Sequence, residues 1–187
     1  MIIMDIPSFS RGSFGSAFPY SKPIKRKIFI SYHHKNDQGW YDGFSRYFSD
    51  TLELFYDNSL ERRIDSDDSD YLNRKVREEY IFGTSVTIVL CGSETWKRRW
   101  IDWEIHATLF YKHGLIGIGL PTCSRNYNQK YIVPTRLHQN VDSGYALWMD
   151  WTENAAILNQ NIQEAVRRSS FTSLKRNEDL KMQRSYS

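Results

Sequence analysis

A glutamate at position 104 occupies a predicted helix in which no neighbouring side chain can neutralise it. It belongs to the run Lys97-Arg98-Arg99-Trp100-Ile101-Asp102-Trp103-Glu104-Ile105. Because each residue of a helix advances by about 100 degrees, Glu104 shares a face with Trp100, Thr108 and Tyr111. The residues three and four positions away include no cation, which excludes a stabilising pair within the helix. A carboxylate in such apolar surroundings is paired, protonated or used in chemistry.

Two interpretations of Glu104 remain open at this point. One is an ion pair with a lysine or arginine of another element, and the other is a catalytic carboxylate. The rest of the helix is apolar on both sides of this position, and Asp102, His106 and His113 form its narrow polar stripe. Glu104 lies outside this stripe, so it is the carboxylate of this helix that needs an explanation.

The apolar pattern alternates between short β-rich runs and longer amphipathic segments, which is typical of an α/β layer structure. Ser93 is the expected N-cap of the Glu104 helix and Gly114 its stop. Residues 121–143, rich in Asn, Gln, Pro and Tyr, are expected to form a loop. The expected strands cover residues 27–32, 54–56, 85–91, 115–120 and 145–149, and the expected helices 39–52, 71–82, 93–113 and 153–168.

Five strands separated by helices predict a flavodoxin-like three-layer fold with a mainly parallel sheet in the order 2-1-3-4-5. The ligand crevice of such a fold lies at the carboxyl ends of the first and third strands. Three polar motifs fall at this edge: Ser31-Tyr32-His33-His34 after the first strand, Asp57 after the second and Gly92-Ser93 after the third.

Composition predicts one globular domain at residues 25–168, preceded by a poorly ordered extension at 1–24 and followed by a polar, basic tail at 169–187 that frays beyond Ser169. The net charge of +3 conceals basic ends and an acidic middle, which argues against a nucleic-acid-binding surface on the domain. No apolar run is long enough to cross a membrane, and no secretory signal precedes the domain. We therefore expect a cytoplasmic protein. Cys91 and Cys123 lack the spacing of a metal or redox pair, and no metal site is predicted.

The combination of Phe29-Ile30-Ser31-Tyr32, a charged loop after the second strand and Trp100-x-x-x-Glu104 resembles the TIR (Toll/interleukin-1 receptor) domain family over about residues 26–168. Within it, the pair His33-His34, the turn Gly92-Ser93-Glu94-Thr95 and the run Arg98-Arg99-Trp100 look most like the bacterial TIR-like subunit of the Thoeris anti-phage system.

This resemblance implies an enzyme that cleaves NAD at the nicotinamide–ribose bond and makes a cyclic ADP-ribose isomer, which activates a separate effector. NAD is then the substrate, and no further cofactor is expected. Glu104 would be catalytic, with Ser31, Tyr32, His33, Asp57 and Trp100 binding the substrate. A phage-derived activator and assembly into a homo-oligomer are both compatible with the absence of an attached sensor domain.

The chemistry fits one carboxylate, because the nicotinamide leaves as a neutral ring and needs no general acid, unlike the leaving group of an ordinary glycosidase. Trp100, Trp103 and Tyr32 could form a wall that excludes water and favours cyclisation, although the two tryptophans are equally compatible with a core role. Two other functions remain open: a non-enzymatic TIR interaction module and a hydrolase that depletes NAD. The sequence does not distinguish hydrolase from cyclase, nor does it define the role of loop 58–70, which suits assembly, gating or a solvated helix cap.

Overall fold

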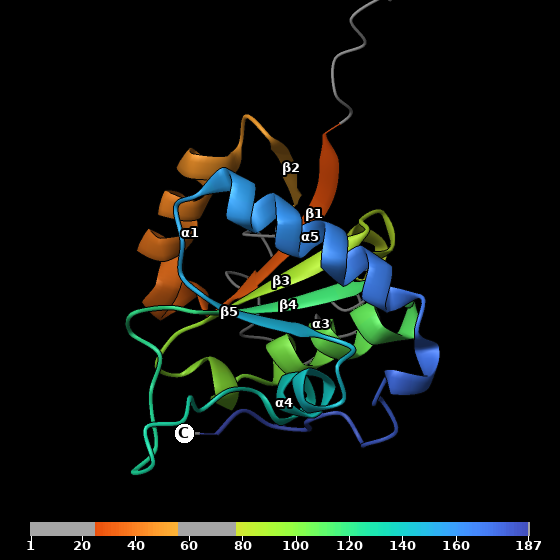
Figure 1. The fold of residues 1–187 in the computed structure, drawn as a ribbon. Coiled ribbons are helices and arrows are strands. Elements are labelled where there is room, and N and C mark those ends of the chain that lie inside the picture. The colour runs from red at the N-terminus through yellow and green to blue at the C-terminus, as the bar shows by residue number, and fades with distance from the viewer. Residues whose placement is uncertain (1–24, 56–77, 187) are drawn as a thin grey trace, which may run out of the picture.

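Five strands form one sheet in the order β2-β1-β3-β4-β5 (Figure 1). The computed structural model describes residues 25–55 and 78–186. All four strand pairings within these ranges are parallel, so the predicted flavodoxin-like order is confirmed. The strands are β1 (Arg26–Tyr32), β2 (Leu52–Phe55), β3 (Val86–Cys91), β4 (Gly114–Gly119) and β5 (Leu147–Asp150).

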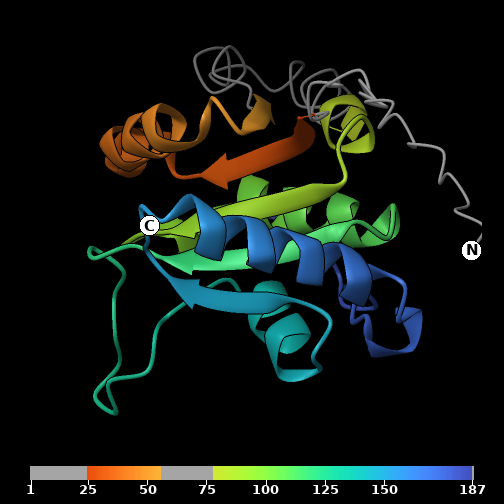
Figure 2. The same ribbon diagram turned by 45° about the horizontal axis from the view of Figure 1, so that its top comes forward.

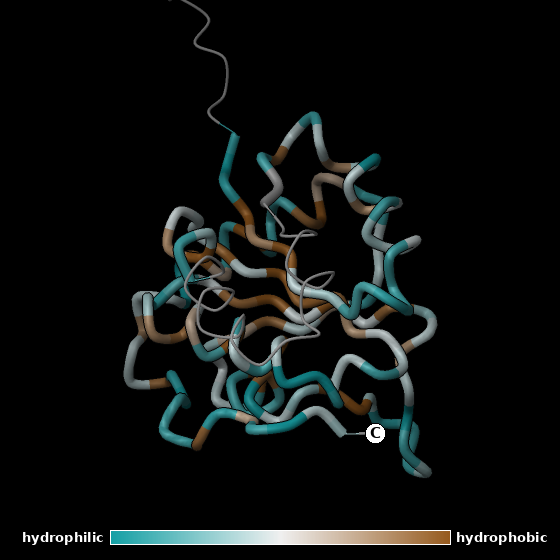
Figure 3. The backbone as a smooth tube through the Cα atoms, turned by 180° about the vertical axis from the view of Figure 1, so that it is seen from behind, coloured by the Kyte–Doolittle hydropathy of each residue, from teal (hydrophilic) through white to brown (hydrophobic). Residues whose placement is uncertain are grey.

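Strands β3 and β4 explain why the sheet forms. Every residue of β3 and of β4 is buried. A strand covered on both faces favours a run rich in Val, Ile and Leu, as in β3, whereas β4 alternates glycine with Leu and Ile. In Figure 3 these strands appear as brown segments through the middle of the molecule, while the teal, hydrophilic segments lie mostly outside them.

Helices cover both faces of the sheet and complete three layers (Figures 1 and 2). Helices α1 (His34–Phe48) and α5 (Ala155–Ser169) cover one face, and α3 (Arg99–Phe110) and α4 (Thr135–Asp142) cover the other. Asn154 caps α5, because its side-chain oxygen accepts hydrogen bonds from the amides of Ala156 and Ile157. Within the described ranges, no helix has the length and apolar character needed to cross a lipid bilayer.

The helices differ from the prediction in three places. Helix α1 begins at His34 rather than near Gly39. The segment predicted as one helix from Ser93 is a short 3-10 turn, η2 (Thr95–Lys97), followed by α3, so Ser93 is not the N-cap. The predicted loop 121–143 contains α4, whose eight residues are too few to give a clear periodic pattern. Of the predicted helix 71–82, residues 78–82 are helical and the rest lies outside the described residues.

The C-terminal residues do not fray as expected. After the 3-10 turn η3 (Thr172–Leu174), residues 175–186 run along α4 and α3, and we call this segment the C-terminal strap. Asn140 of α4 bonds the backbone of Arg176 in both directions, at 2.7 and 2.9 Å. These short-range polar contacts repeat along the strap, and their specific geometry overrides the disorder that a charged, polar composition suggests. The predicted extension 1–24 lies outside the described residues.

Candidate functional site

Strand β1 presents Ser31 and His33 to the α3 side of the sheet and Tyr32 to the α1 side. Side chains alternate along a strand, and Phe29, two residues before Ser31, packs with Ala107 of α3. His33 continues the alternation because its backbone is extended. Tyr32 instead stacks on Tyr41 of α1, with ring centroids 4.8 Å apart.

The predicted wall of Tyr32, Trp100 and Trp103 is therefore not assembled. The Tyr32 hydroxyl donates to the Gln38 side chain at 2.8 Å, on the face of the sheet that α3 does not cover. Trp103 packs edge-on against Trp100 with ring centroids 5.0 Å apart, and its indole N–H donates to the carbonyl of Met182 in the strap at 2.7 Å. Only Trp100 of these three aromatic residues stays on the same helical face as Glu104.

Helix α3 holds Glu104 at the level of Ser31. One turn later, the Thr108 hydroxyl is 2.7 Å from that of Thr87 on β3, and Thr87 is in register with Phe29 of β1. One helical turn rises by about 6 Å, as do two residues of a strand. Because α3 runs back along the sheet from its carboxyl edge, Glu104 lies at the level of Ser31, and Trp100 lies one turn further, at the level of His33. Both α3 side chains are buried, with 5% and 9% of their surfaces exposed.

Three buried polar atoms near this edge have no hydrogen-bond partner among the described residues: the Ser31 hydroxyl, Nδ1 of His33 and Nε of Arg98. Burial lowers the pKa of His33 to about 4, and the nearby Arg98 guanidinium lowers it further. The imidazole is therefore neutral at physiological pH and can donate or accept a hydrogen bond without attracting an anion. Unsatisfied buried polar groups are costly, by about 1–3 kcal/mol each, and they are typical of a site that a ligand completes.

A second buried carboxylate, Asp37, lies at the same edge and was missed by the sequence reasoning. It accepts a hydrogen bond from the Thr95 hydroxyl at 3.3 Å, and that hydroxyl accepts from the amide of Gly92 at 2.8 Å. Burial raises the pKa of Asp37 to about 6, the Thr95 hydrogen bond lowers it, and nearby Glu94 raises it. This network ties the start of α1 to the turn after β3. The available signal was its position on the apolar face of α1, four residues before Tyr41.

Asp102, which belongs to the polar stripe of α3, is buried, with 6% of its surface exposed. Arg136 of α4 pairs with it, with Nε and Oδ1 3.0 Å apart, and the amide of Met182 donates to Oδ2 at 2.8 Å. Partial burial, with nearby Lys181, also lowers the pKa of His106 to about 4. Asp102 and His106 therefore lie next to α4 and the strap. The sequence reasoning missed this pair because it assigned Arg136 to a loop.

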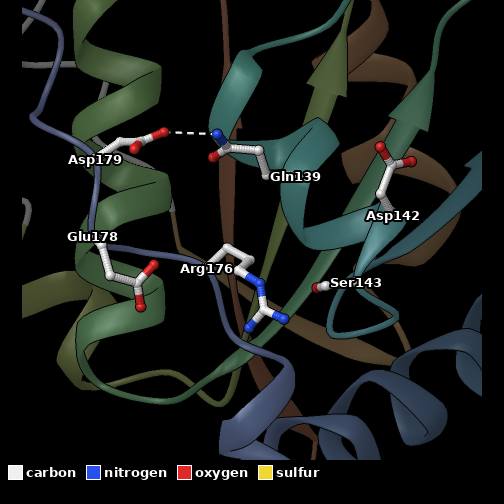
Figure 4. Close-up of a pocket in the computed structure, with 6 residues that line it drawn as sticks. All are labelled: Gln139, Asp142, Ser143, Arg176, Glu178 and Asp179. Carbon is white, nitrogen blue, oxygen red and sulfur yellow. Dashed lines mark hydrogen bonds between the residues drawn. The ribbon is translucent and has the colours of Figure 1, made fainter.

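A pocket of about 420 Å³ lies between the end of α4 and the strap (Figure 4). Gln139 donates to Asp179 at 2.6 Å across its rim. None of the predicted site residues lines it; the lining residues are Gln139, Asp142, Ser143, Arg176, Glu178 and Asp179. Because three carboxylates and one guanidinium line it, the pocket does not favour a ligand of one particular charge.

The prediction for Asp57 and for the loop 58–70 falls outside the described residues. The structure therefore brings Ser31, His33, Trp100 and Glu104 to one face of the sheet edge and puts Tyr32 on the other. In the part of the chain that the structure describes, no three His, Cys, Asp or Glu side chains are grouped so that they could hold a metal ion.

Comparisons with known proteins support the sequence resemblance. The model of the family described as "Thoeris protein ThsB, TIR-like domain" matches residues 29–125, which include every candidate site residue named above. No curated protein sequence matches the chain. Among solved structures, a match is found to the TIR domains in the activated Roq1 resistosome directly recognizing the pathogen effector XopQ. That match has a TM-score of 0.38 and 10% identity, and it covers 80% of this chain and 83% of the other.

The family match covers more than half of the chain, and its range begins in β1 and continues past β4, through the elements that carry the site. With the parallel sheet in the order β2-β1-β3-β4-β5, the resemblance drawn from the sequence motifs is confirmed. The chain belongs to the Thoeris ThsB family of TIR-like domains.

Proposed function

We propose that this protein is an NAD-consuming enzyme that breaks the nicotinamide–ribose bond and forms a cyclic ADP-ribose isomer as an anti-phage signal. Its product would diffuse to a separate effector protein in the cytoplasm. Glu104 is the proposed catalytic residue, with Ser31, His33 and Trp100 beside the substrate. Membership in the Thoeris ThsB family supports a defence role.

The observation that carries the proposal is the shared level of Glu104 and Ser31 at the carboxyl edge of the sheet. A buried carboxylate and a buried hydroxyl that has no hydrogen-bond partner among the described residues lie on the same side of β1. The hydroxyl groups of a sugar can pair with the Ser31 hydroxyl, which donates or accepts a hydrogen bond, and can also donate to a carboxylate oxygen. The edge between β1 and β3 is also where folds of this topology bind their ligands.

One carboxylate suffices for the bond cleavage. The nicotinamide of NAD is positively charged and becomes neutral as it leaves, so no acid has to protonate it. Positive charge then develops on the ribose, and a carboxylate held close to that ring stabilises it more strongly in the transition state than in the ground state. Glu104 is fixed on a helix that is packed on both sides, which keeps this charge in place without reorganisation.

Cyclisation requires that a group of the product itself replaces water as the acceptor. Trp100, which is 9% exposed and packs edge-on against Trp103 at 5.0 Å, offers an apolar surface one turn from Glu104. Exclusion of water beside the reacting carbon favours an internal acceptor. If water enters instead, the same site gives linear ADP-ribose and depletes NAD.

The direct test is to incubate the purified full-length chain with NAD and separate the products by chromatography, both alone and with extract from phage-infected cells. A cyclic isomer of ADP-ribose is expected. If linear ADP-ribose is the sole product, the protein is a hydrolase rather than a cyclase. If NAD stays intact under both conditions, the protein is a non-enzymatic interaction module.

The matched variants are Glu104→Gln and Glu79→Gln. The first removes the negative charge with almost no change in size and should lower turnover by about 10²- to 10³-fold, as the loss of one preorganised electrostatic group does. The second removes the charge of an exposed glutamate that is not among the proposed site residues, and it should leave turnover unchanged. If the Glu104→Gln variant keeps wild-type turnover, Glu104 is not catalytic; if it unfolds, the Glu104 carboxylate is a structural group.

A further inference from the structure

The turn between β3 and α3 holds a compact group of charged side chains that the proposed chemistry does not use. Glu94 and Arg98 flank η2, and Asn36 reaches them from the first turn of α1. The group therefore bridges the ends of β1 and β3, next to His33. It lies where the ligand crevice of a flavodoxin-like sheet is expected.

Glu94 accepts hydrogen bonds from three donors in this group. Nη2 of Arg98 lies 2.6 Å from its Oε2, Nδ2 of Asn36 lies 3.0 Å from the same oxygen, and Nζ of Lys97 lies 3.2 Å from Oε1. The contacts with Lys97 and Arg98 lower the pKa of Glu94, so the carboxylate is ionised. A single anion thus already gathers two cations and an amide at the edge of the site.

Arg98 is only partly satisfied by this contact. Its Nε is buried and has no hydrogen-bond partner in the described ranges, although its side chain is 29% exposed. A guanidinium presents its donors in a planar fork that suits two oxygens of a phosphate or carboxylate. Here the fork donates to Glu94 from Nη2, while Nε has no partner in the described ranges and is therefore a donor that a second anionic oxygen can match.

The neighbouring histidine cannot take that role. His33 lies near Arg98, and the Arg98 charge itself is among the causes that keep its imidazole neutral. A dinucleotide carries two negative phosphates, and a neutral imidazole attracts them weakly compared with a guanidinium. The cation for these phosphates must then come from another residue at this edge.

We propose that Arg98 binds the pyrophosphate of the dinucleotide substrate and that Glu94 occupies Arg98 until the substrate displaces it. This inference rests on the proposed function for the identity of the substrate. Glu94 acts as an internal competitor: its carboxylate holds the fork in place in the empty site, and a phosphate with more oxygens and more charge replaces it. Arg98 is thus a substrate-binding residue and Glu94 a residue that sets the affinity.

The binding test uses ADP-ribose and inorganic pyrophosphate as probes, titrated into the full chain by calorimetry. Arg98→Gln should weaken ADP-ribose binding by about 10- to 100-fold, the loss expected for charge-assisted hydrogen bonds. Arg98→Lys keeps the charge without the planar fork, so its affinity for ADP-ribose should lie between those of the wild type and the Arg98→Gln variant. Arg46→Gln, an exposed arginine in the last turn of α1, is the matched control and should bind like the wild type.

Glu94→Gln gives the opposite and more distinctive result. Without the competing carboxylate, pyrophosphate and ADP-ribose should bind about two- to fivefold more tightly, which is the strength of a partly exposed ion pair. In turnover assays, Arg98→Gln should raise the KM for NAD and leave kcat nearly unchanged. The thermal stability of each variant, measured alongside, identifies any that is misfolded.

Two results would overturn the assignment: ADP-ribose binding by the Arg98→Gln variant at wild-type affinity, or weaker binding after Glu94→Gln in a folded protein. Failure of the proposed function can be told apart from failure of this assignment. If the wild-type protein leaves NAD intact, the enzymatic function is wrong, but the pyrophosphate titration still shows whether Arg98 binds an anion.

Discussion

Replacement of Arg136 by methionine should cost this protein a large part of its stability, because it strands a buried charge. The Arg136 side chain is 3% exposed and that of Asp102 is 9% exposed. Besides the 3.0 Å contact with Asp102, the guanidinium donates to Asn177 at 3.0 Å and to the carbonyls of Asp179 and Leu180 at 3.0 and 3.1 Å. One side chain therefore joins α4, α3 and the strap.

The magnitude follows from the charge left behind. Removing one partner of a buried ion pair costs about 3–5 kcal/mol, because the other charge stays desolvated. In a protein of this length each kcal/mol lowers the melting temperature by about 2–4 °C, so Arg136→Met should lower it by about 6–20 °C. The strap also loses its three bonds to the guanidinium, and its backbone amides should exchange hydrogen faster than those of β3.

Chemical denaturation gives the free energy of unfolding, and hydrogen exchange followed by mass spectrometry locates the loosened segment. The double variant Asp102→Leu with Arg136→Met is the control, since it removes both charges and should recover at least half of the loss. A single variant within about 1 kcal/mol of the wild type, below the range for a broken buried pair, would refute the reasoning. So would a double variant as unstable as the single one.

Two further predictions concern the network between α1 and the turn after β3. Gly92→Ala should destabilise the fold by about 1–3 kcal/mol, because an added Cβ would clash with the carboxylate of Asp37. Gly39→Ala, in α1 with nothing within 4 Å of the added atom, should instead stabilise the fold by about 0.5–1 kcal/mol. Thermal denaturation compares the two variants. Burial raises the pKa of Asp37 from 3.8 to about 6, so its protonated form stabilises the folded state fully below pH 3.8, and this contribution is lost as the pH rises through 6. Unfolding measured from about pH 4 to pH 7 should show Asp37→Asn gaining about 2 kcal/mol relative to the wild type, and parallel curves for the two proteins would contradict the assigned pKa.

The fold was predictable because its signals are strong and local. A continuous apolar run such as Val86–Cys91 has few alternatives to a buried strand, and the alternation of such strands with amphipathic helices leaves few topologies. Helix α4 was missed for the opposite reason. Its eight residues include few apolar positions, and its formation depends on Arg136 and Asn140 meeting partners that are distant in the sequence.

The candidate site could be predicted only in part. Glu104 stood out as a carboxylate on an apolar face, and Asp37 offers the same signal on α1. Tyr32 was grouped with Trp100 by motif, although side-chain alternation along β1 puts Tyr32 and Ser31 on opposite faces. The role proposed for Arg98 depends on an unmatched Nε, which is a property of three-dimensional packing that no spacing of residues reveals.

The strap has a consequence for biosynthesis. Helix α3 begins with no side-chain cap of its own; instead the amide of Arg99 donates to the hydroxyl of Ser185 at 3.2 Å, and the amide of Tyr186 donates to the carbonyl of Lys97 at 3.0 Å. These bonds form only after residues 182–186 have emerged from the ribosome. A chain without these residues therefore lacks the contacts that fix the start of the Glu104 helix.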